Sequence, residues 1–384
     1  MPKALVIEDS ALMRRQIKRI LSDAGFEVST ARNGVEALEQ VALVDPDVIT
    51  LDINMPEMDG LTFLSRLMIE RPKPVVMISS LTEKGALATF EALEMGAIDF
   101  VHKPDGTVSH NIARIETEIV DKVRAAMGSR LSRARGLRQR MRAEREGGRP
   151  ALRVPPASVK PVFTAPPAKP AFSAVPAKPA GASDALPSVV VIGVSTGGPG
   201  TLEEILTPLP ADFPWAILVA QHMPAGFTGV FARRLDDACA ITVREVAQPM
   251  PIEPGTVYIG RGDADFVVTR RGRQLMASAV PSSAEWFWHP SVNHLVYSAM
   301  KHLPPAQLIG VLLTGMGNDG AEAMTALHNA GGRTIAESEE SAVVFGMPQE
   351  LIKLGGAEVV LPAGQVAGRL VEWVSRASRR QRLG

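Results

Sequence analysis

A proline-rich segment divides this chain into two parts. Ten prolines lie between Pro150 and Pro187, and the sequence PAKP occurs twice in that stretch. A segment so rich in proline, alanine and lysine cannot bury a hydrophobic core, so we expect a semi-rigid, partly polyproline-II linker. On both sides of it, short aliphatic runs alternate with helix-patterned segments, which is typical of parallel α/β sheets.

Two domains fit the length of 384 residues, because a single hydrophobic core rarely grows so large. We expect doubly wound α/β domains at 1–127 and 188–384, the second of them Rossmann-like, joined by a basic helix extension and linker at 128–187. Within the second domain, the stretch 255–272 (GTVYIGRGDADFVVTRRG) predicts a small excursion of paired antiparallel strands with turns at glycine.

The composition limits the compartment and the partners. The formal net charge is zero, so no overall field attracts nucleic acid or anionic lipid. The single cysteine, Cys239, excludes a disulfide framework and suits a reducing compartment. The first residues do not have the pattern of a signal peptide, and the apolar runs are too short to cross a membrane. These features predict a cytoplasmic protein with no membrane insertion.

A run of basic residues precedes the linker. Seven arginines lie between Arg130 and Arg145, and a helix with this composition could contact phosphates of nucleic acid. The run has no aromatic residue for stacking on bases, and the chain has no recognisable DNA- or RNA-binding module. A solvated helix is the favoured interpretation, and we expect no nucleic-acid partner.

Acidic residues end the aliphatic runs of the first domain. Glu8 and Asp9 follow the first run and Asp52 ends a later one, so a parallel sheet would bring all three carboxylates to one edge. Such carboxylates repel one another unless a hard cation such as Mg²⁺ lies among them, and the site could form an aspartyl phosphate. Ser79 and Lys103 end two further runs and could bind phosphoryl oxygens. Each of these residues alone could be a helix cap, but their occurrence in this order at the ends of successive aliphatic runs favours a functional site.

Residues 1 to about 125 resemble the receiver domains of bacterial response regulators, which are flavodoxin-like. The resemblance implies that Asp52 accepts a phosphoryl group. Together with the second domain, it implies that the donor of this group is a chemosensory histidine kinase. It also implies the remaining roles: the magnesium ligands are Glu8, Asp9 and Asp52, and the switch residues are Ser79, Phe100 and Lys103.

In the second domain, the aliphatic run 189–194 breaks into glycines around Ser195. The pattern GVSTG matches G-x-S-x-G, the turn that exposes a nucleophilic serine at the end of a strand. The same glycines could cradle a phosphate, but the spacing of a P-loop or a dinucleotide site is absent. His222 and Asp319 follow two other aliphatic runs. Together they predict a triad in which Asp319 orients His222 and His222 takes the proton of Ser195.

Other interpretations of these residues remain. Asp319 within GNDG could be a turn residue, and His222 could be a buried histidine without a catalytic role. The order Ser, His, Asp differs from that of α/β-hydrolases, which disfavours that fold. The glycines around Met316 could bring N–H groups to an oxyanion. His289 and His294 have no third ligand at metal-binding spacing, so a metal site there is disfavoured.

Several motifs in fixed order resemble chemotaxis-type protein-glutamate methylesterases: VSTGGP, QHMP, HPSVN, LLTGMGNDGA and VVFGMPQE. The resemblance implies a cytoplasmic hydrolase that removes methyl esters from chemoreceptor glutamates, releases methanol, often deamidates receptor glutamines, and needs no organic cofactor. It implies that Ser195 is the nucleophile, that His222 is the general base and acid, and that Asp319 is the orienting acid. It also implies that Thr196 and Met316 line the site.

The resemblance also implies regulation. The unphosphorylated receiver is expected to cover the esterase edge, and phosphorylation at Asp52 to move Ser79 and Phe100 inward and weaken that interface.

A few positions depart from the pattern of the family. His289 and Asn293 stand where members usually have arginine and aspartate, and Glu337 and Ser338 stand where they have glutamine and aspartate. The triad motifs are intact, so the departures affect the docking surface and suggest a receptor of a specialised chemosensory array. A catalytically idle adaptor is the rival hypothesis, and a receiver with a DNA-binding output is a third.

Overall fold

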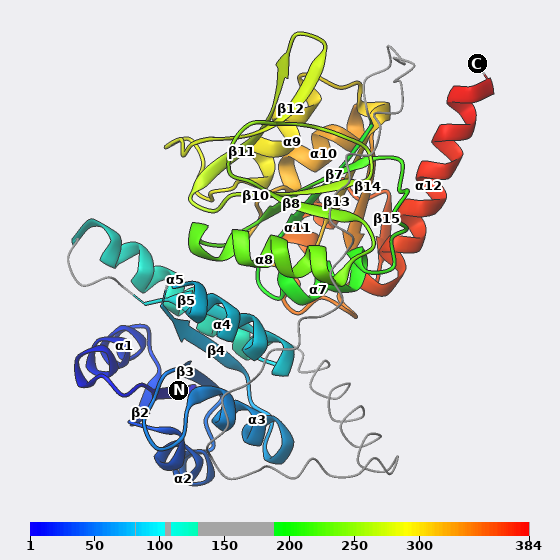
Figure 1. Cartoon of the computed structure of the whole chain (residues 1–384). Helices are drawn as coiled ribbons and strands as arrows, with labels where there is room; N and C mark the ends of the chain where they lie inside the picture. The colour runs from blue at the N-terminus through cyan, green and yellow to red at the C-terminus, as the bar shows by residue number, and fades with distance from the viewer. Residues whose placement is uncertain (81, 104–108, 130–187, 384) are drawn as a thin grey trace, which may run out of the picture.

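The structure is a computed structural model that describes residues 1–80, 82–103, 109–129 and 188–383 (Figure 1). Of the basic extension and linker expected at 128–187, only residues 128 and 129 are described. The rest of that prediction lies outside the described residues.

The first domain is a five-stranded parallel sheet in the order β2-β1-β3-β4-β5. Its strands are β1 (Lys3–Ile7), β2 (Glu27–Ala31), β3 (Val48–Asp52), β4 (Val75–Ser79) and β5 (Asp99–His102). Its helices are α1 (Ala11–Asp23), α2 (Gly34–Val44), α3 (Gly60–Glu70), α4 (Glu83–Met95) and α5 (Ser109–Gly128).

Local sequence explains where these helices begin. Ser10, Asn33, Asp59 and Thr82 each accept a hydrogen bond from a backbone N–H of the following first turn, which satisfies a donor that the helix leaves unpaired. Every residue of β3 and β4 is buried, as expected for central strands covered on both faces. The expectation of a doubly wound parallel sheet is confirmed.

The second domain is built on a seven-stranded parallel sheet in the order β15-β14-β13-β6-β7-β10-β8. Its strands are β6 (Val189–Val194), β7 (Ala216–Gln221), β8 (Thr242–Val246), β10 (Thr256–Gly260), β13 (Leu308–Leu312), β14 (Arg333–Glu337) and β15 (Val359–Leu361). The helices are α7 (Gly198–Leu206), α8 (Ala225–Ala238), α9 (Val292–Met300), α10 (Ala321–Asn329), α11 (Met347–Lys353) and α12 (Ala363–Leu383), with a short 3₁₀ turn at Pro305–Gln307.

The antiparallel excursion exists, but its pairing differs from the prediction. The small sheet has the order β11-β12-β9, with β9 at Met250–Pro251, β11 at Ala264–Arg271 and β12 at Gln274–Pro281. The prediction paired the two halves of 255–272; instead β10 joins the parallel sheet between β7 and β8, where all five of its residues are buried. The reversal comes one strand later, at Gly272, whose φ of +62° suits a hairpin turn.

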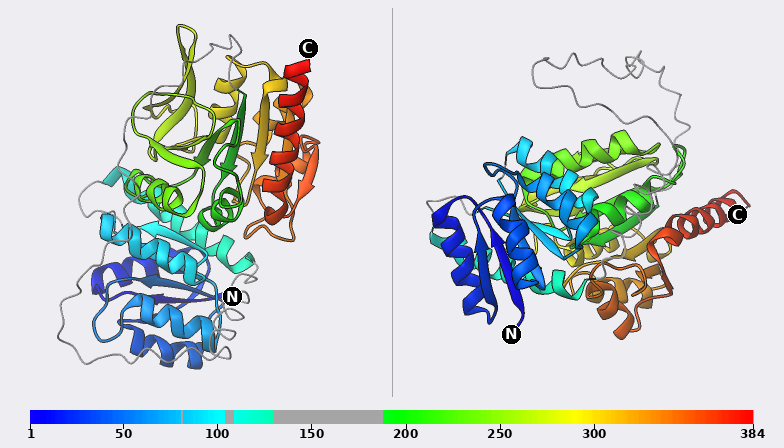
Figure 2. Two further views of the ribbon diagram at one scale, coloured as in Figure 1. Left: turned by 45° about the vertical axis from the view of Figure 1, so that its right-hand side comes forward. Right: turned by 90° about the horizontal axis from the view of Figure 1, so that it is seen from below.

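The two domains are in contact through helices (Figures 1 and 2). Helix α4 of the first domain lies against α7 and α8 of the second. Phe90 on α4 stacks on Phe231 of α8 with ring centroids 5.4 Å apart, and Glu94 forms an ion pair with Arg234. Among the described residues, no helix combines the length and the apolar character that a membrane span requires.

Candidate active site and receiver site

Ser195 lies at the carboxyl edge of the parallel sheet, directly after β6. Its N–H donates to the Thr314 carbonyl (2.9 Å), and its own carbonyl accepts from Gln221 Nε2 (3.0 Å). The chain then turns sharply into α7 through Gly197, whose φ is +77°, a conformation that favours glycine. The backbone of Ser195 is therefore fixed from the two strands that flank β6, which is the geometry expected of a nucleophile elbow.

His222 and Asp319 form the second part of this site. β7 and β13 flank β6 in the sheet, and the loops that follow them carry His222 and Asp319. His222 Nε2 lies 2.9 Å from Asp319 Oδ2, and both side chains are about 5% exposed. The structure thus brings the two residues together. Asp319 does lie in a turn, but its carboxylate is buried against His222.

The beginning of α9 holds the Asp319 carboxylate. Oδ1 accepts from Ser291 Oγ (3.0 Å) and the Asn293 N–H (3.0 Å), and Oδ2 accepts from the Val292 N–H (2.7 Å). Burial by itself raises the pKa of Asp319, but the hydrogen bond and charge of His222 and these N–H donors outweigh burial and lower it. Asp319 is therefore held ionised, ready to stabilise a protonated imidazole.

The other nitrogen of His222 is free for proton transfer. Within the described part of the chain, Nδ1 is buried without a hydrogen-bond partner, and no hydrogen bond joins it to Ser195 Oγ. Because Nε2 faces the Asp319 carboxylate, it carries the proton of the neutral ring and leaves Nδ1 as the acceptor. The Trp288 ring stacks on the imidazole with centroids 4.6 Å apart and planes 8° apart, which fixes the ring orientation.

The two predicted lining residues have different surroundings. Thr196 is buried and donates from Oγ1 to Asp99 Oδ2 of the first domain (2.6 Å). Met316 is half-buried, next to Gly315. A side chain at Gly315 has no room, because a Cβ there would lie 2.7 Å from the Ser195 Cβ. The loop after β13 therefore approaches the serine closely with its backbone.

The acidic site of the first domain also has its predicted residues together. Ligand oxygens of Glu8, Asp9 and Asp52 lie within 4.8 Å of one another, and the Lys103 ammonium lies 2.8 Å from Asp52 and 3.1 Å from Glu8. Burial, and then the charge of Asp52, raise the pKa of Glu8 to about 7, although Lys103 opposes the shift. Burial likewise raises the pKa of Asp52 against the opposing effect of Lys103. Two buried carboxylates with raised pKa values fit a place for a divalent cation.

The two remaining switch candidates are directed away from this acidic site. Ser79 Oγ accepts from Thr89 Oγ1 (2.8 Å) and donates to the Gly85 carbonyl (3.3 Å), so it contacts α4. The Phe100 ring packs on Phe227 of α8 with centroids 4.4 Å apart. Phe100 thus belongs to the domain interface, whereas Ser79, the last residue of β4, contacts the helix α4 that forms that interface.

Comparison with known proteins connects both sites to one family. The CheB methylesterase family model matches residues 190–370, and the response regulator receiver domain matches residues 4–111. The protein-glutamate methylesterase/protein-glutamine glutaminase 3 of Rhodospirillum rubrum is 55% identical over 377 residues, which are 98% of this chain and 97% of that protein. The chain belongs to this methylesterase family.

A second relative agrees with the assignment, and a solved structure is similar to part of the chain. Protein-glutamate methylesterase/protein-glutamine glutaminase 2 of Rhodopseudomonas palustris is 48% identical, over 97% of this chain and 98% of its own length. The solved catalytic domain of the Thermotoga maritima CheB methylesterase is 38% identical, with a TM-score of 0.47, covering 49% of this chain and 99% of that chain. The two resemblances found in the sequence are confirmed: this methylesterase-family chain joins a hydrolase domain to a receiver, the module of phosphorylation-dependent regulation.

Several residues around the methylesterase site were missed by the sequence analysis. Gln221 bonds the Ser195 carbonyl, Thr314 bonds the Thr196 carbonyl through its hydroxyl (2.8 Å), and Glu337 Oε2 accepts from the Thr314 N–H (2.7 Å). Their positions at the ends of buried strands were a usable signal. Trp288, by contrast, follows no strand, and nothing in the local sequence predicts that it stacks on His222.

The receiver contacts the residue next to the serine of this methylesterase site. Asp99, at the start of β5, accepts the Thr196 hydroxyl, and its other oxygen lies 3.4 Å from the Lys122 ammonium. Burial by itself lowers the pKa of Lys122, but the carboxylates of Asp99 and Glu118 have the larger effect and raise this pKa. Lys122 also donates to the Phe100 carbonyl (2.6 Å). Charged and aromatic groups of β5 and α5 therefore share one network with the loop that carries Ser195 and Thr196.

Proposed function

We propose that this chain hydrolyses methyl esters of glutamate side chains in chemoreceptors, with Ser195 as the nucleophile, His222 as general base and acid, and Asp319 as the orienting acid. The observation that carries the proposal is the buried His222–Asp319 pair, whose imidazole keeps one free acceptor nitrogen at the sheet edge where Ser195 lies. We place the reaction in the cytoplasm, and assign it to the domain at 188–384.

The reaction divides into two steps that share one acid–base residue. Ser195 Oγ attacks the ester carbonyl carbon while His222 Nδ1 takes the hydroxyl proton, and backbone N–H groups of the loops around Thr196 and Met316 stabilise the oxyanion. The imidazolium, stabilised by Asp319, returns the proton to the methoxy oxygen, so methanol leaves and an acyl-enzyme remains. Water then attacks the acyl-enzyme, His222 takes a proton from the water, and that proton restores the Ser195 hydroxyl as the glutamate carboxyl group leaves.

The same acyl-enzyme accounts for deamidation. Attack on the γ-amide of a receptor glutamine releases ammonia instead of methanol, with His222 as the proton donor. No further group is required, so we propose that the chain carries both activities and uses no organic cofactor.

The domain at 1–127 would receive the phosphoryl group of a chemosensory histidine kinase on Asp52. Glu8, Asp9 and Asp52 would hold Mg²⁺, which neutralises phosphoryl oxygens when bound. Lys103, already paired with Asp52, would transfer its ion pair to the phosphate, and Ser79 would leave its bonds to α4 to meet the same group. Movement of Ser79 and Phe100 would loosen the interface of α4 and β5 with the second domain.

The contact between Asp99 and Thr196 supports an inhibitory role for the unphosphorylated receiver. A receptor helix that reaches Ser195 must approach the loop that Asp99 now contacts. Loss of the interface would raise the fraction of chains in which this loop is open to the substrate.

The test is methanol release from methylated chemoreceptor membranes. We expect release by the full chain, an increase when a small phosphodonor and Mg²⁺ are added, and loss of at least a thousandfold in Ser195→Ala, because a triad acts as a unit. Asp52→Asn serves as the control for the phosphodonor and should keep only the basal rate. Signalling that persists in a strain carrying Ser195→Ala would instead favour the adaptor hypothesis.

A further inference from the structure

An exposed aromatic side chain lies beside the proposed catalytic histidine. The Phe287 side chain is 70% exposed, although phenylalanine is usually buried. Its ring meets Trp288 edge to face, with centroids 4.9 Å apart and planes 85° apart, and Trp288 stacks on His222. Phe287 is therefore one aromatic ring away from the imidazole and faces solvent.

The segment that carries Phe287 is anchored by buried polar groups. The fully buried Asp265 accepts His289 Nδ1 on one oxygen (2.6 Å) and the Ser283 N–H on the other (2.9 Å). The Asp263 N–H donates to the His289 carbonyl (3.2 Å). Both ends of the segment are thus tied to the beginning of β11, so the exposure of Phe287 belongs to a defined conformation and not to a loose loop.

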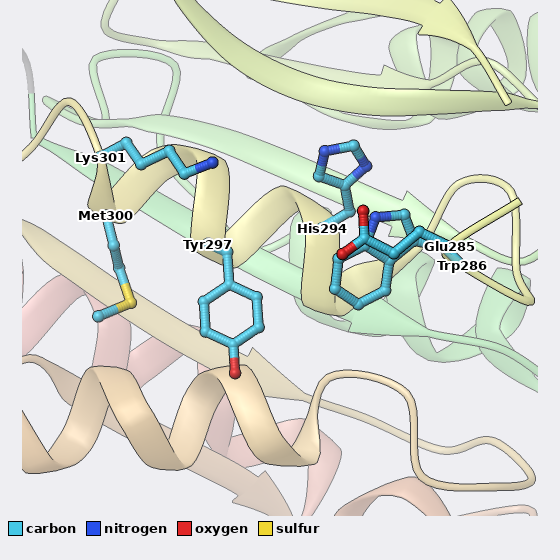
Figure 3. A pocket seen from close by; sticks show the side chains of 6 residues that line it. All are labelled: Glu285, Trp286, His294, Tyr297, Met300 and Lys301. Carbon is cyan, nitrogen blue, oxygen red and sulfur yellow. The ribbon is translucent and has the colours of Figure 1, made fainter. Parts of the chain in front are cut away.

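A hollow of about 450 Å³ adjoins this segment. Figure 3 shows Lys301 and Met300 at one end of it, Glu285 and Trp286 at the other, and His294 and Tyr297 between them. Trp286 stacks on His294 with centroids 5.3 Å apart. Aromatic rings and a methionine thioether therefore form most of the wall. Such a surface suits an apolar or long amphipathic side chain.

The rim of the hollow carries two opposite charges. Glu285 and Lys301 are both exposed, and within the described residues neither has an ion-pair partner. They lie at opposite ends of the hollow in Figure 3. The two charges that the chain leaves unpaired at this hollow are available to a charged partner.

We propose that Phe287 and this hollow form a docking surface for one helix of the receptor substrate, on the Trp288 side of the ester. The inference rests on the proposed function and identifies which part of the chain recognises the substrate. A helix presents side chains at i, i+3, i+4 and i+7 on one face. With the methyl ester at Ser195, the neighbours on that face would place an apolar side chain against Phe287 and charged side chains near Glu285 and Lys301.

The primary experiment compares steady-state methanol release by the full chain on two substrates. One is methylated receptor membranes, and the other is N-acetyl-glutamate γ-methyl ester amide, which is too small to span from Ser195 to Phe287. Phe287→Ala should lower kcat/KM on receptor about tenfold, mainly through KM, as truncation of an anchoring aromatic does. The ratio of the receptor rate to the small-ester rate should fall by the same factor.

Matched variants separate docking from folding. Phe287→Trp should restore most of the receptor rate, because it keeps an exposed ring, and Val360→Ala removes an apolar side chain that is 45% exposed on the edge strand β15 and should change nothing. Glu285→Lys and Lys301→Glu should each raise KM for receptor several-fold at low salt and less at high salt, since salt screens exposed charges.

The outcomes are distinguishable. A KM of Phe287→Ala on receptor equal to that of the unaltered chain would overturn the docking surface while leaving the esterase intact. If Phe287→Ala lost activity on both substrates to the same extent, the residue would belong to the catalytic centre. This result would also overturn the docking surface. No methanol from either substrate with the unaltered chain would refute the proposed function, and the docking surface with it.

Discussion

At the scale of single residues, two contacts hold the imidazole of His222 and a third holds its backbone. Asp319 binds Nε2, the Trp288 ring covers one face, and Gln221 Nε2 donates to the His222 carbonyl (3.1 Å). Of the two imidazole nitrogens, only Nδ1 lacks a hydrogen-bond partner within the described residues. A histidine restrained in this way can exchange a proton without reorienting, which lowers the reorganisation needed for general base catalysis.

At the same scale, the raised pKa of Glu8 predicts how the stability of the receiver depends on pH. Its pKa is raised from 4.5 to about 7 by burial and by Asp52, so between these values the folded state binds more protons than the unfolded state. Stability therefore falls as pH rises from about 4.5 through 7. We expect Glu8→Gln to stabilise the receiver at pH 8 by about 1 to 3 kcal/mol in chelator-treated buffer, and to have little effect at pH 4.5.

Thermal unfolding of the full chain as a function of pH measures this effect. Glu36→Gln provides a control, because Glu36 forms its ion pair on the exposed surface of α2 and such pairs contribute little. A stability gain in Glu8→Gln that is as large at pH 4.5 as at pH 8 would contradict the raised pKa.

At the scale of elements, the packing of α4 against α8 joins the receiver to the esterase. Phe90 contacts both Phe227 and Phe231, and the ion pair of Glu94 with Arg234 adds a charge contact that is only partly exposed. Helices of this kind separate as units, so weakening one contact shifts the equilibrium between closed and open arrangements.

Reversing one interface charge should therefore activate the unphosphorylated chain. Glu94→Lys places a positive charge against Arg234, and repulsion of about 1 kcal/mol would raise basal methanol release roughly fivefold. The rate with phosphodonor should change little, because the interface is then already open. Adding Arg234→Glu should return the basal rate toward that of the unaltered chain.

Glu91→Lys is the matched control, since Glu91 is exposed on the same helix and, among the described residues, forms no ion pair across the interface. Equal basal rates in Glu94→Lys and the unaltered chain would show that this interface does not restrain catalysis.

At the scale of the whole molecule, the receiver and the esterase each carry a site at the carboxyl edge of a parallel sheet. The two sites communicate only if the domain interface responds to Asp52, and β5 and α4 are the elements that connect them, through Phe100, Asp99 and Ser79. Phosphorylation should therefore be visible at the interface as well as in the rate.

We expect hydrogen exchange in α4 and α8 to accelerate about tenfold when the phosphodonor and Mg²⁺ are added to the full chain, because open chains expose these helix faces. Exchange in α10 should stay the same, as this helix lies away from the receiver (Figure 1). Asp52→Asn should abolish the acceleration. Faster methanol release with unchanged exchange in α8 would mean that activation does not require separation of the domains.

The amino-acid sequence by itself determined that the chain forms parallel α/β sheets, and it predicted which side chains would meet at the edge of each sheet. This was possible because strand ends in a parallel sheet share one edge, so Ser195, His222 and Asp319, or Glu8 and Asp52, are brought together by topology alone. Helix caps such as Asn33 and Asp59 are likewise local.

The tertiary structure alone decided several of the contacts around those sites. The position of β10 within the parallel sheet, the stacking of Trp288 on His222, and the hydrogen bond from Thr196 to Asp99 all join residues far apart in the chain. Contacts of this kind depend on how faces pack and which buried polar groups find partners, and neither periodicity nor spacing along the sequence encodes that information.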